Sequence, residues 1–184
     1  MNVPQKIILV QLFSNGDCLY ATAVARQIKA DYPGCHLTWA IADFCKSIIS
    51  GNPFVDDIMV VTDVAKNDEA AFRKLKKELL NRKDKGEFDE VIITHIMGSN
   101  QANYDGCIRS AIFRGYHKLI TLPVTPVLRL SIEEQEKANL FAHQHELNKY
   151  SQVILFEFAP QSGQSKINKD FAIELAEALT GQKM

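Results

Sequence analysis

Short apolar runs alternate along the chain with longer segments of mixed polarity. The first run, Ile7-Ile8-Leu9-Val10, leads into the polar turn Phe13-Ser14-Asn15-Gly16-Asp17 and then into a helical pattern. Most of the runs are separated by helical or polar segments, and this alternation is typical of βαβ units and a parallel sheet. The sequence therefore predicts an α/β fold with strands at residues 6–11, 36–41, 57–61, 90–94 and 118–122.

Helices are predicted between these runs from periodic apolar positions and from start and stop signals. The first carries Leu19, Ala23 and Ile28 on its core side and ends at Pro33-Gly34. A later one opens with a capping box, in which Ser131 is followed by Glu134. The predicted helices cover residues 17–32, 43–50, 68–85, a segment from 131 onward, and 169–179.

The pattern after residue 150 resembles the start of a second domain. A strand is expected at residues 152–156, a polar loop at 161–165, and then the last helix. One strand and one helix are too few to form a stable sheet, so this βα unit is truncated. We expect a first domain over residues 1–150 and an incomplete second domain over 151–184, as in a fragment of a longer protein.

Composition narrows the class of protein. With 184 residues, 46% of them hydrophobic and 23% charged, the chain is long enough to bury a substantial core. The net charge of -1 gives no overall attraction for nucleic acid. The four cysteines show no metal-ligand spacing and are expected to be reduced and mostly buried, and no metal site is expected.

The predicted helix at residues 68–85 is strongly basic. Phe72, Leu75 and Leu79 form one apolar stripe, and lysines and arginines surround it. Such a helix could rest on an anionic membrane. A solvated helix face on an α/β protein is the favoured interpretation, because the stripe is only wide enough to pack on a sheet.

Asp17 is the leading candidate for chemistry. In an open α/β sheet, ligands bind beyond the carboxyl ends of the strands, and Asp17 follows the first strand there. The residues before it form neither a GxGxxG fingerprint nor a P-loop. From spacing alone, Asp17 is a candidate general base or else the N-cap of the first helix.

Several motifs resemble the ADP-heptose:lipopolysaccharide heptosyltransferase family, glycosyltransferase family 9, in its N-terminal half. The hydrophobic strand that runs into Ser14-Asn15-Gly16-Asp17 is similar to the family's opening Ser-x-Gly-Asp turn. The following helix, with Tyr32-Pro33-Gly34 at its end, and the turn Asn52-Pro53-Phe54-Val55-Asp56 also fit. Residues 88–93 resemble a later strand of the family, and residues 153–179 resemble the start of its donor-binding domain.

The resemblance implies the N-terminal, acceptor-binding half of a GT-B fold, a Rossmann-like domain, and the beginning of the donor domain. It implies inverting transfer of a sugar from a nucleotide-sugar donor to a lipopolysaccharide-core or other glycan acceptor. Asp17 would be the general base, and Ser14, Asn15 and Gly16 would hold substrate oxygens, with Gly16 allowing the tight turn. No cofactor is implied, since the nucleotide sugar is a substrate.

His95 and a polar loop near the C-terminus complete the candidate site. His95 ends the fourth predicted strand and could face the same crevice as Asp17 and bind acceptor, although a histidine at the edge of the core or in solvent is the more common situation. Ser162, Gln164, Ser165 and Lys166 resemble the family's donor-diphosphate loop, where a lysine offsets the leaving-group charge. The family's Lys-x-Trp-Pro is replaced here by Lys166-Ile167-Asn168-Lys169, and a surface lysine is the alternative.

Two other functions remain open from the sequence. The chain could be a non-catalytic module that binds a glycan or a protein, or a flavodoxin-like domain that binds a nucleotide. We expect a cytoplasmic protein, with peripheral contact to the inner membrane as a lesser possibility, because no run approaches the length of a membrane span. With most of the donor site absent, the fragment is expected to be inactive alone.

Overall fold

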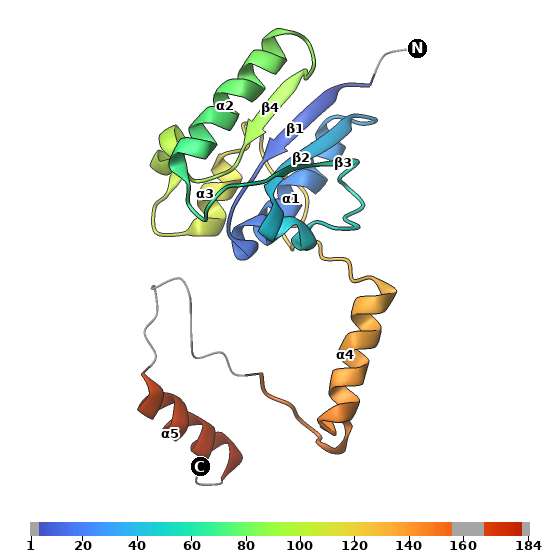
Figure 1. Ribbon diagram of the computed structural model, residues 1–184, viewed down its shortest axis with the longest axis vertical. Coiled ribbons are helices and arrows are strands. Elements are labelled where there is room, and N and C mark those ends of the chain that lie inside the picture. Colours follow the sequence, from blue (N-terminus) through green and yellow to red (C-terminus); the bar gives the residue numbers. More distant parts are fainter. Residues whose placement is uncertain (1–3, 156–167, 182–184) are drawn as a thin grey trace. The chain divides into compact units, whose positions relative to one another are not determined.

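The computed structural model describes residues 4–155 and 168–181. The chain divides into two compact units, Met1–Ile132 and Glu133–Met184, and each is described by itself. The first unit holds the whole sheet and the helices that cover it (Figure 1).

The sheet has four parallel strands, β1 (Lys6–Val10), β2 (His36–Ala42), β3 (Asp57–Val61) and β4 (Glu90–Ile93). Their order is β3-β2-β1-β4, and Leu9 lies opposite Trp39 on one side and Ile92 on the other. The central strand β1 is covered on both faces, which explains why Ile7, Ile8, Leu9 and Val10 are all apolar. These four strands confirm the sequence prediction to within one residue at their ends.

Helices cover both faces of the sheet. α1 (Asn15–Asp31), α3 (Ile108–Arg114) and the short 3₁₀ helix η1 (Asp43–Ile48) lie on one face, and α2 (Glu69–Asp84) lies on the other (Figure 1). The core on the α1 face centres on Leu9, Trp39 and Ile112. On the α2 face, Phe72 and Leu79 of α2 pack against Ile8, Val10 and Ala40. The α/β class expected from the sequence is confirmed.

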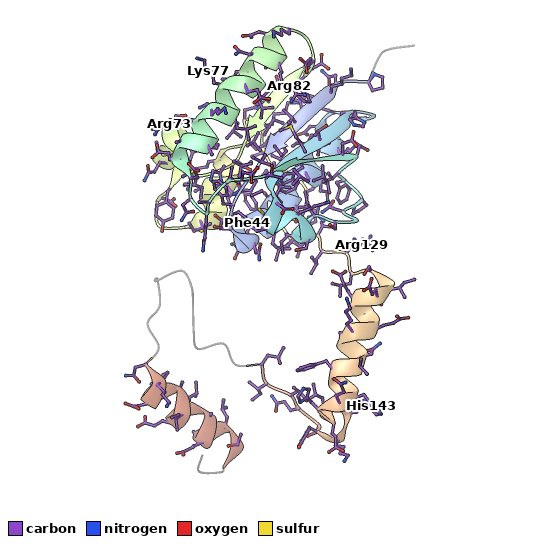
Figure 2. All side chains as sticks on the ribbon, viewed as in Figure 1. Phe44, Arg73, Lys77, Arg82, Arg129 and His143 are labelled. Atoms are coloured by element: carbon purple, nitrogen blue, oxygen red, sulfur yellow. The ribbon has the colours of Figure 1, made fainter. Side chains whose placement is uncertain are left out.

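The apolar stripe of α2 packs against the sheet and not against solvent, since Phe72 and Leu79 are almost completely buried. Arg73 and Lys77 lie on the outer side of the helix (Figure 2). The helix starts at Asp68, whose carboxylate accepts a hydrogen bond from the Ala71 N–H at 2.9 Å. The basic residues therefore form a solvated face of an α/β protein, the favoured one of the two interpretations from the sequence. Among the helices of residues 4–155 and 168–181, none is both long and apolar enough to cross a membrane.

The strand predicted at residues 118–122 is wrong. The N–H groups of Thr121 and Leu122 each donate to Oε1 of Gln27 on α1, both at 2.9 Å, instead of pairing with a strand. Leu119 is 80% exposed, and Pro123 follows directly. The residues of this segment favour a strand, but the buried side chain of Gln27 on α1 accepts the backbone hydrogen bonds that a neighbouring strand would otherwise accept.

The second unit contains α4 (Ile132–Gln144), the 3₁₀ helix η3 (Leu147–Lys149) and α5 (Lys169–Thr180). Both predicted helices are therefore present. The strand predicted at residues 152–156 is wrong over its described part, because residues 152–155 are not in a strand. A strand needs a neighbouring strand for its backbone hydrogen bonds. The division into domains at residue 150 is a separate point and stays a prediction.

The helical segments that follow β4 were not predicted from the sequence. The 3₁₀ helix η2 (Gly98–Asn103) and α3 follow β4, in a region with weak periodicity. Here Asn100 donates through its side chain to the carbonyl oxygens of Ile93 and His95, at 2.7 and 3.3 Å. This side chain holds the segment after β4 close to the end of that strand.

Candidate functional site

The strand order reverses between β1 and β4, and this reversal is where a ligand crevice is expected. The chain runs from β1 to β2 and β3 on one side, and then returns through α2 to β4 on the other side of β1. Ligands of open α/β sheets bind at this kind of reversal, beyond the carboxyl ends of the strands. The turn that carries Asp17 follows β1, and His95 follows β4, so both predicted residues belong to this end of the sheet.

Asp17 lies in the first turn of α1 and is half-buried. Burial raises the pKa of its carboxyl to about 6, and the charge of Lys66 lowers the pKa by a smaller amount. Within the part of the chain that the structure describes, no group hydrogen-bonds to this carboxylate or pairs with it. Asp17 therefore presents a partly desolvated carboxylate whose oxygens are available to a ligand.

The alternative role of Asp17 as an N-cap is not supported. The capping position of α1 is Ser14, and its side chain makes no capping hydrogen bond. Asp17 lies two residues after the first helical residue, Asn15, where a carboxylate interacts favourably with the free N–H groups of the helix start.

The turn before Asp17 differs in one respect from the sequence interpretation. The left-handed residue is Ser14, with φ 68°, while Gly16 has an ordinary φ and nothing within 4 Å of the position of a Cβ. The assignment of the tight turn to Gly16 is therefore wrong. Asn15 and Gly16 are exposed, and Ser14 is half-buried, so this turn is open to contact. Their role in substrate binding stays a prediction.

A buried polar network lies beneath this turn and was missed from the sequence. Its centre is Gln11, which is fully buried directly after β1. The Gln11 amide nitrogen donates to Nδ1 of His95 at 3.0 Å, and its Oε1 accepts from the Thr94 hydroxyl at 3.1 Å. The Gln11 carbonyl oxygen accepts from Nε1 of Trp39 at 3.1 Å. This network joins the carboxyl ends of β1 and β4 to Trp39 in the middle of β2. A glutamine just after an apolar run was the one sequence signal that could have indicated it.

His95 is buried and uncharged. Its exposed fraction is only 5%, and its ring lies against Phe13 and Phe72, with centroid distances of 5.1 and 5.2 Å. Burial lowers the pKa of the imidazole to about 4. Because Gln11 donates to Nδ1, the proton is on Nε2, which is buried with no hydrogen-bond partner among the described residues. This placement is that of a histidine at the edge of the core, and acceptor contact by His95 stays a prediction.

An exposed aromatic ring lies on the same part of the molecule. Phe44, in η1 (Figure 2), is 49% exposed. Its ring stacks on Phe13 at a centroid distance of 6.1 Å. Phe13 in turn contacts His95. Phe44 therefore adds one exposed apolar ring that packs on Phe13 of the segment leading to Asp17.

The other predicted site residues cannot be placed. Ser162, Gln164, Ser165 and Lys166 lie outside the described residues. Within residues 4–155 and 168–181, no three histidine, cysteine, aspartate or glutamate side chains are grouped so that they could hold a metal ion.

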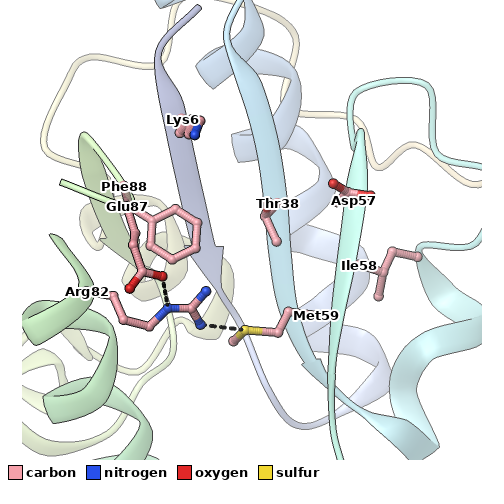
Figure 3. Close-up of a pocket in the computed structure, with 8 residues that line it drawn as sticks. All are labelled: Lys6, Thr38, Asp57, Ile58, Met59, Arg82, Glu87 and Phe88. Carbon is pink, nitrogen blue, oxygen red and sulfur yellow. Dashed lines mark hydrogen bonds and ion pairs between the residues drawn. The ribbon is translucent and has the colours of Figure 1, made fainter. Parts of the chain in front are cut away.

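A separate hollow of about 460 Å³ lies on the α2 face (Figure 3). It includes Lys6, Asp57 and Phe88, which lie at or before the starts of β1, β3 and β4, and so at the opposite end of the sheet from Asp17. Arg82 on its wall is already bonded to Glu87 at 2.8 Å and to the Met59 sulfur at 3.6 Å. This hollow is not part of the crevice.

Comparison with known proteins shows the fold. No family model matches the sequence, and no curated protein matches it. Among solved structures, a glycosyltransferase family 9 protein from Veillonella parvula DSM 2008 is 15% identical with a TM-score of 0.69, over 97% of this chain and 61% of that chain. The E. coli heptosyltransferase WaaC, solved with ADP, is 15% identical over 84% of this chain and 51% of that one, with a TM-score of 0.38.

The chain therefore has the fold of one part of a family 9 glycosyltransferase and spans about three-fifths of that protein's length. This is the family that the sequence motifs resemble. At 15% identity the likeness establishes the fold and not the activity.

Proposed function

We propose that the chain is the acceptor-binding side of a heptosyltransferase-like GT-B glycosyltransferase, with Asp17 as the general base. The observation that carries this proposal is the free, half-buried carboxylate at the point where the strand order reverses. The fold shared with a family 9 glycosyltransferase and the resemblance of the opening turn support it.

The proposed reaction is a single displacement at a sugar carbon. Asp17 accepts the proton of an acceptor hydroxyl while that oxygen attacks the anomeric carbon of the donor sugar. The bond from the anomeric carbon to the nucleoside diphosphate breaks, and its electrons leave with the diphosphate. Attack from the face opposite the leaving group inverts the configuration at that carbon.

The raised pKa of Asp17 suits this role. A carboxyl with a pKa of about 6 is mostly ionised at neutral pH, and it is a stronger base than an exposed aspartate. The desolvation that raises the pKa also strengthens the interaction of the carboxylate with a hydroxyl proton in the crevice. The neutral His95 beneath the turn adds no competing positive charge.

The donor side of the reaction belongs to the segment after residue 150. We assign the nucleotide-sugar diphosphate to the loop with Ser162, Gln164, Ser165 and Lys166, where the lysine would offset the leaving-group charge. The acceptor is a lipopolysaccharide-core or other glycan hydroxyl, which fits a cytoplasmic enzyme working at the inner membrane. Because the chain spans only part of its structural relative, we expect no transfer by residues 1–184 alone.

The test is the replacement Asp17→Asn in the protein as its complete gene encodes it. Asn keeps the size of the side chain but does not accept the proton, so turnover should fall about 10²- to 10⁴-fold, with a smaller change in KM. The readout is release of nucleoside diphosphate from a panel of nucleotide sugars in the presence of glycan acceptors.

Asp43→Asn is the matched control. Asp43 is an exposed carboxylate in the first turn of η1, and its replacement should leave turnover within about twofold. Equal turnover of Asp17→Asn and the unchanged protein, with any donor that supports transfer, would contradict the assignment of the base.

A further inference from the structure

The hollow on the α2 face of the sheet (Figure 3) has the size and the side chains of a ligand site. Its volume is about 460 Å³, within the range of roughly 300 to 1,000 Å³ that small-molecule sites occupy. We propose that it binds a small organic anion, with a carboxylate or phosphate group on an apolar body. Such binding is independent of the glycosyltransferase function, because the hollow lies at the opposite end of the sheet from Asp17.

The floor of the hollow is the sheet itself, at a place that α2 does not cover. Side chains alternate along a strand, so Thr38 of β2 lies on the same face as Ala40. Ala40 is fully buried under α2, whereas Thr38 is only half-buried. Met59 of β3 and Phe88, just before β4, line the hollow beside Thr38. An apolar body can therefore lie on the sheet here and contact both side chains.

Arg82, near the end of α2, presents a fixed guanidinium to the hollow. Its Nε donates to Oε2 of Glu87 at 2.8 Å, and its Nη1 donates to the Met59 sulfur at 3.6 Å. The guanidinium carbon lies 4.8 Å from the centroid of the Phe88 ring. These contacts hold the group in one orientation, while Nη2 donates to no group within residues 4–155 and 168–181. A cation already held in place loses little freedom when it binds a carboxylate or phosphate.

The side chains of the hollow that lack partners can all donate hydrogen bonds. The Lys6 ammonium makes no hydrogen bond or ion pair with the described part of the chain, and neither does the Thr38 hydroxyl. Both line the same hollow as Arg82 (Figure 3). An ammonium, a guanidinium and a hydroxyl together suit the oxygens of an anion.

The carboxylates around the hollow already have partners. Oδ2 of Asp57 lies 2.8 Å from Nε2 of His36, and Glu87 accepts from Arg82. Glu78, also on α2, lies 4.0 Å from the Arg82 guanidinium and does not line the hollow. A cationic ligand would have to displace one of these contacts, whereas an anion meets donors that are free.

The experiment is a titration of the folded, ¹⁵N-labelled chain with phenyl phosphate, followed by amide signals in NMR spectra. We expect saturable shifts for the amides of Lys6, Thr38, Met59 and Phe88, with a dissociation constant of about 1 mM or lower. The amides of the turn before Asp17 should not follow the same curve.

Two variants test the charge and the floor separately. Lys6→Met keeps the length of the side chain and removes its charge, so binding should weaken about 5- to 10-fold. Thr38→Phe should abolish binding, because the larger ring occupies the floor. Lys46→Met is the matched control, since Lys46 is an exposed lysine of η1 outside the hollow, and it should leave the affinity within about twofold.

Four further probes identify the part of the ligand that matters. Inorganic phosphate lacks the apolar body and benzamide lacks the charge, so each should bind at least about fivefold more weakly than phenyl phosphate. Benzoate and phenyl phosphonate carry different anionic groups on the same ring, and the tighter of the two shows whether a carboxylate or a phosphorus oxyanion is preferred.

The proposed site would be overturned by any of three results. The first is the absence of saturable shifts at the amides of the hollow with up to about 20 mM phenyl phosphate. The second is unchanged affinity in Lys6→Met when its spectrum shows a folded chain. The third is equal binding of inorganic phosphate and phenyl phosphate, since surface cations alone would explain it.

Discussion

At the scale of single residues, the proposed role of Asp17 depends on its environment and not on its position alone. The sequence places a carboxylate after the first strand, and a conventional N-cap would occupy much the same position. The structure separates these roles, because Ser14 holds the capping position and Asp17 is half-buried with no partner among the described residues. The pKa of about 6 follows from tertiary burial, which no local pattern of residues could show.

The ionisation of Asp17 predicts how stability depends on pH. Its folded pKa of about 6 is above the usual 3.8, so its contribution to stability is present below pH 3.8 and is lost as the pH rises through 6. His95 acts in the opposite sense, since its folded pKa of about 4 is below 6.5 and its contribution is lost as the pH falls through 4. The two partly cancel between pH 4 and 6.5.

Asp17→Asn should therefore be more stable than the unchanged chain at pH 7.5, by about 2 kcal/mol. The difference should shrink to under about 1 kcal/mol at pH 4, where Asp17 is protonated in the folded state, and should vanish well below pH 3.8, where it is protonated in both states. Urea unfolding at pH 7.5, 6 and 4 measures it, and the His95 contribution cancels because both proteins carry it. A difference that does not change with pH would contradict the desolvated carboxylate.

At the scale of secondary-structure elements, the end of α3 is tightly fitted to the end of β4. A Cβ on Gly115 would lie 2.7 Å from the Thr94 Cα and 2.8 Å from the Ile93 carbonyl oxygen, both backbone atoms that cannot move aside separately. Gly115→Ala should therefore destabilise the fold by about 2 kcal/mol, measured by denaturant unfolding.

Gly16→Ala is the matched control for this prediction. Nothing lies within 4 Å of its Cβ position, and its φ is ordinary, so alanine in the first turn of α1 should change stability by less than about 1 kcal/mol, in the stabilising direction. If Gly115→Ala were as stable as Gly16→Ala, the close contact between α3 and β4 would be wrong.

The elements show what the sequence could and could not predict. β1 to β4 and the helices α1, α2, α4 and α5 follow from local periodicity and capping residues such as Asp68. The strand expected at residues 118–122 failed because Gln27, over 90 residues earlier, satisfies the backbone of Thr121 and Leu122. In the site, Asp17 was found from its place in the chain, but the Gln11 network was not, because it needs three strands to come together.

At the scale of the whole molecule, the two units differ in how much core they contain. The first unit holds both clusters of buried side chains around the sheet. In the second unit, α4 has no buried residue and α5 has only Ala172, over the part of the chain that the structure describes. Leu155 is 88% exposed and Leu140 57%. Stability should come almost entirely from the first unit, because exposed apolar side chains contribute little to it.

Removal of residues 133–184 should therefore leave the melting temperature within about 3 °C of that of the whole chain. Removal of everything after Arg114 should prevent folding, because it deletes the buried Tyr116 and the segment bonded to Gln27. Circular dichroism melts of the two truncated chains make the comparison. A large loss of stability in the first truncation would show that residues 133–184 add a core to the first unit.

The pH dependence of kcat/KM for sugar transfer tests the proposed role of Asp17 most directly. In the complete protein, kcat/KM should fall tenfold per pH unit below about pH 6, where the Asp17 carboxylate becomes protonated, and should be level above it. The residual activity of Asp17→Asn should lack this limb. A profile that stays flat from pH 5 to 7, or a limb near pH 6 that survives in Asp17→Asn, would contradict Asp17 as the base.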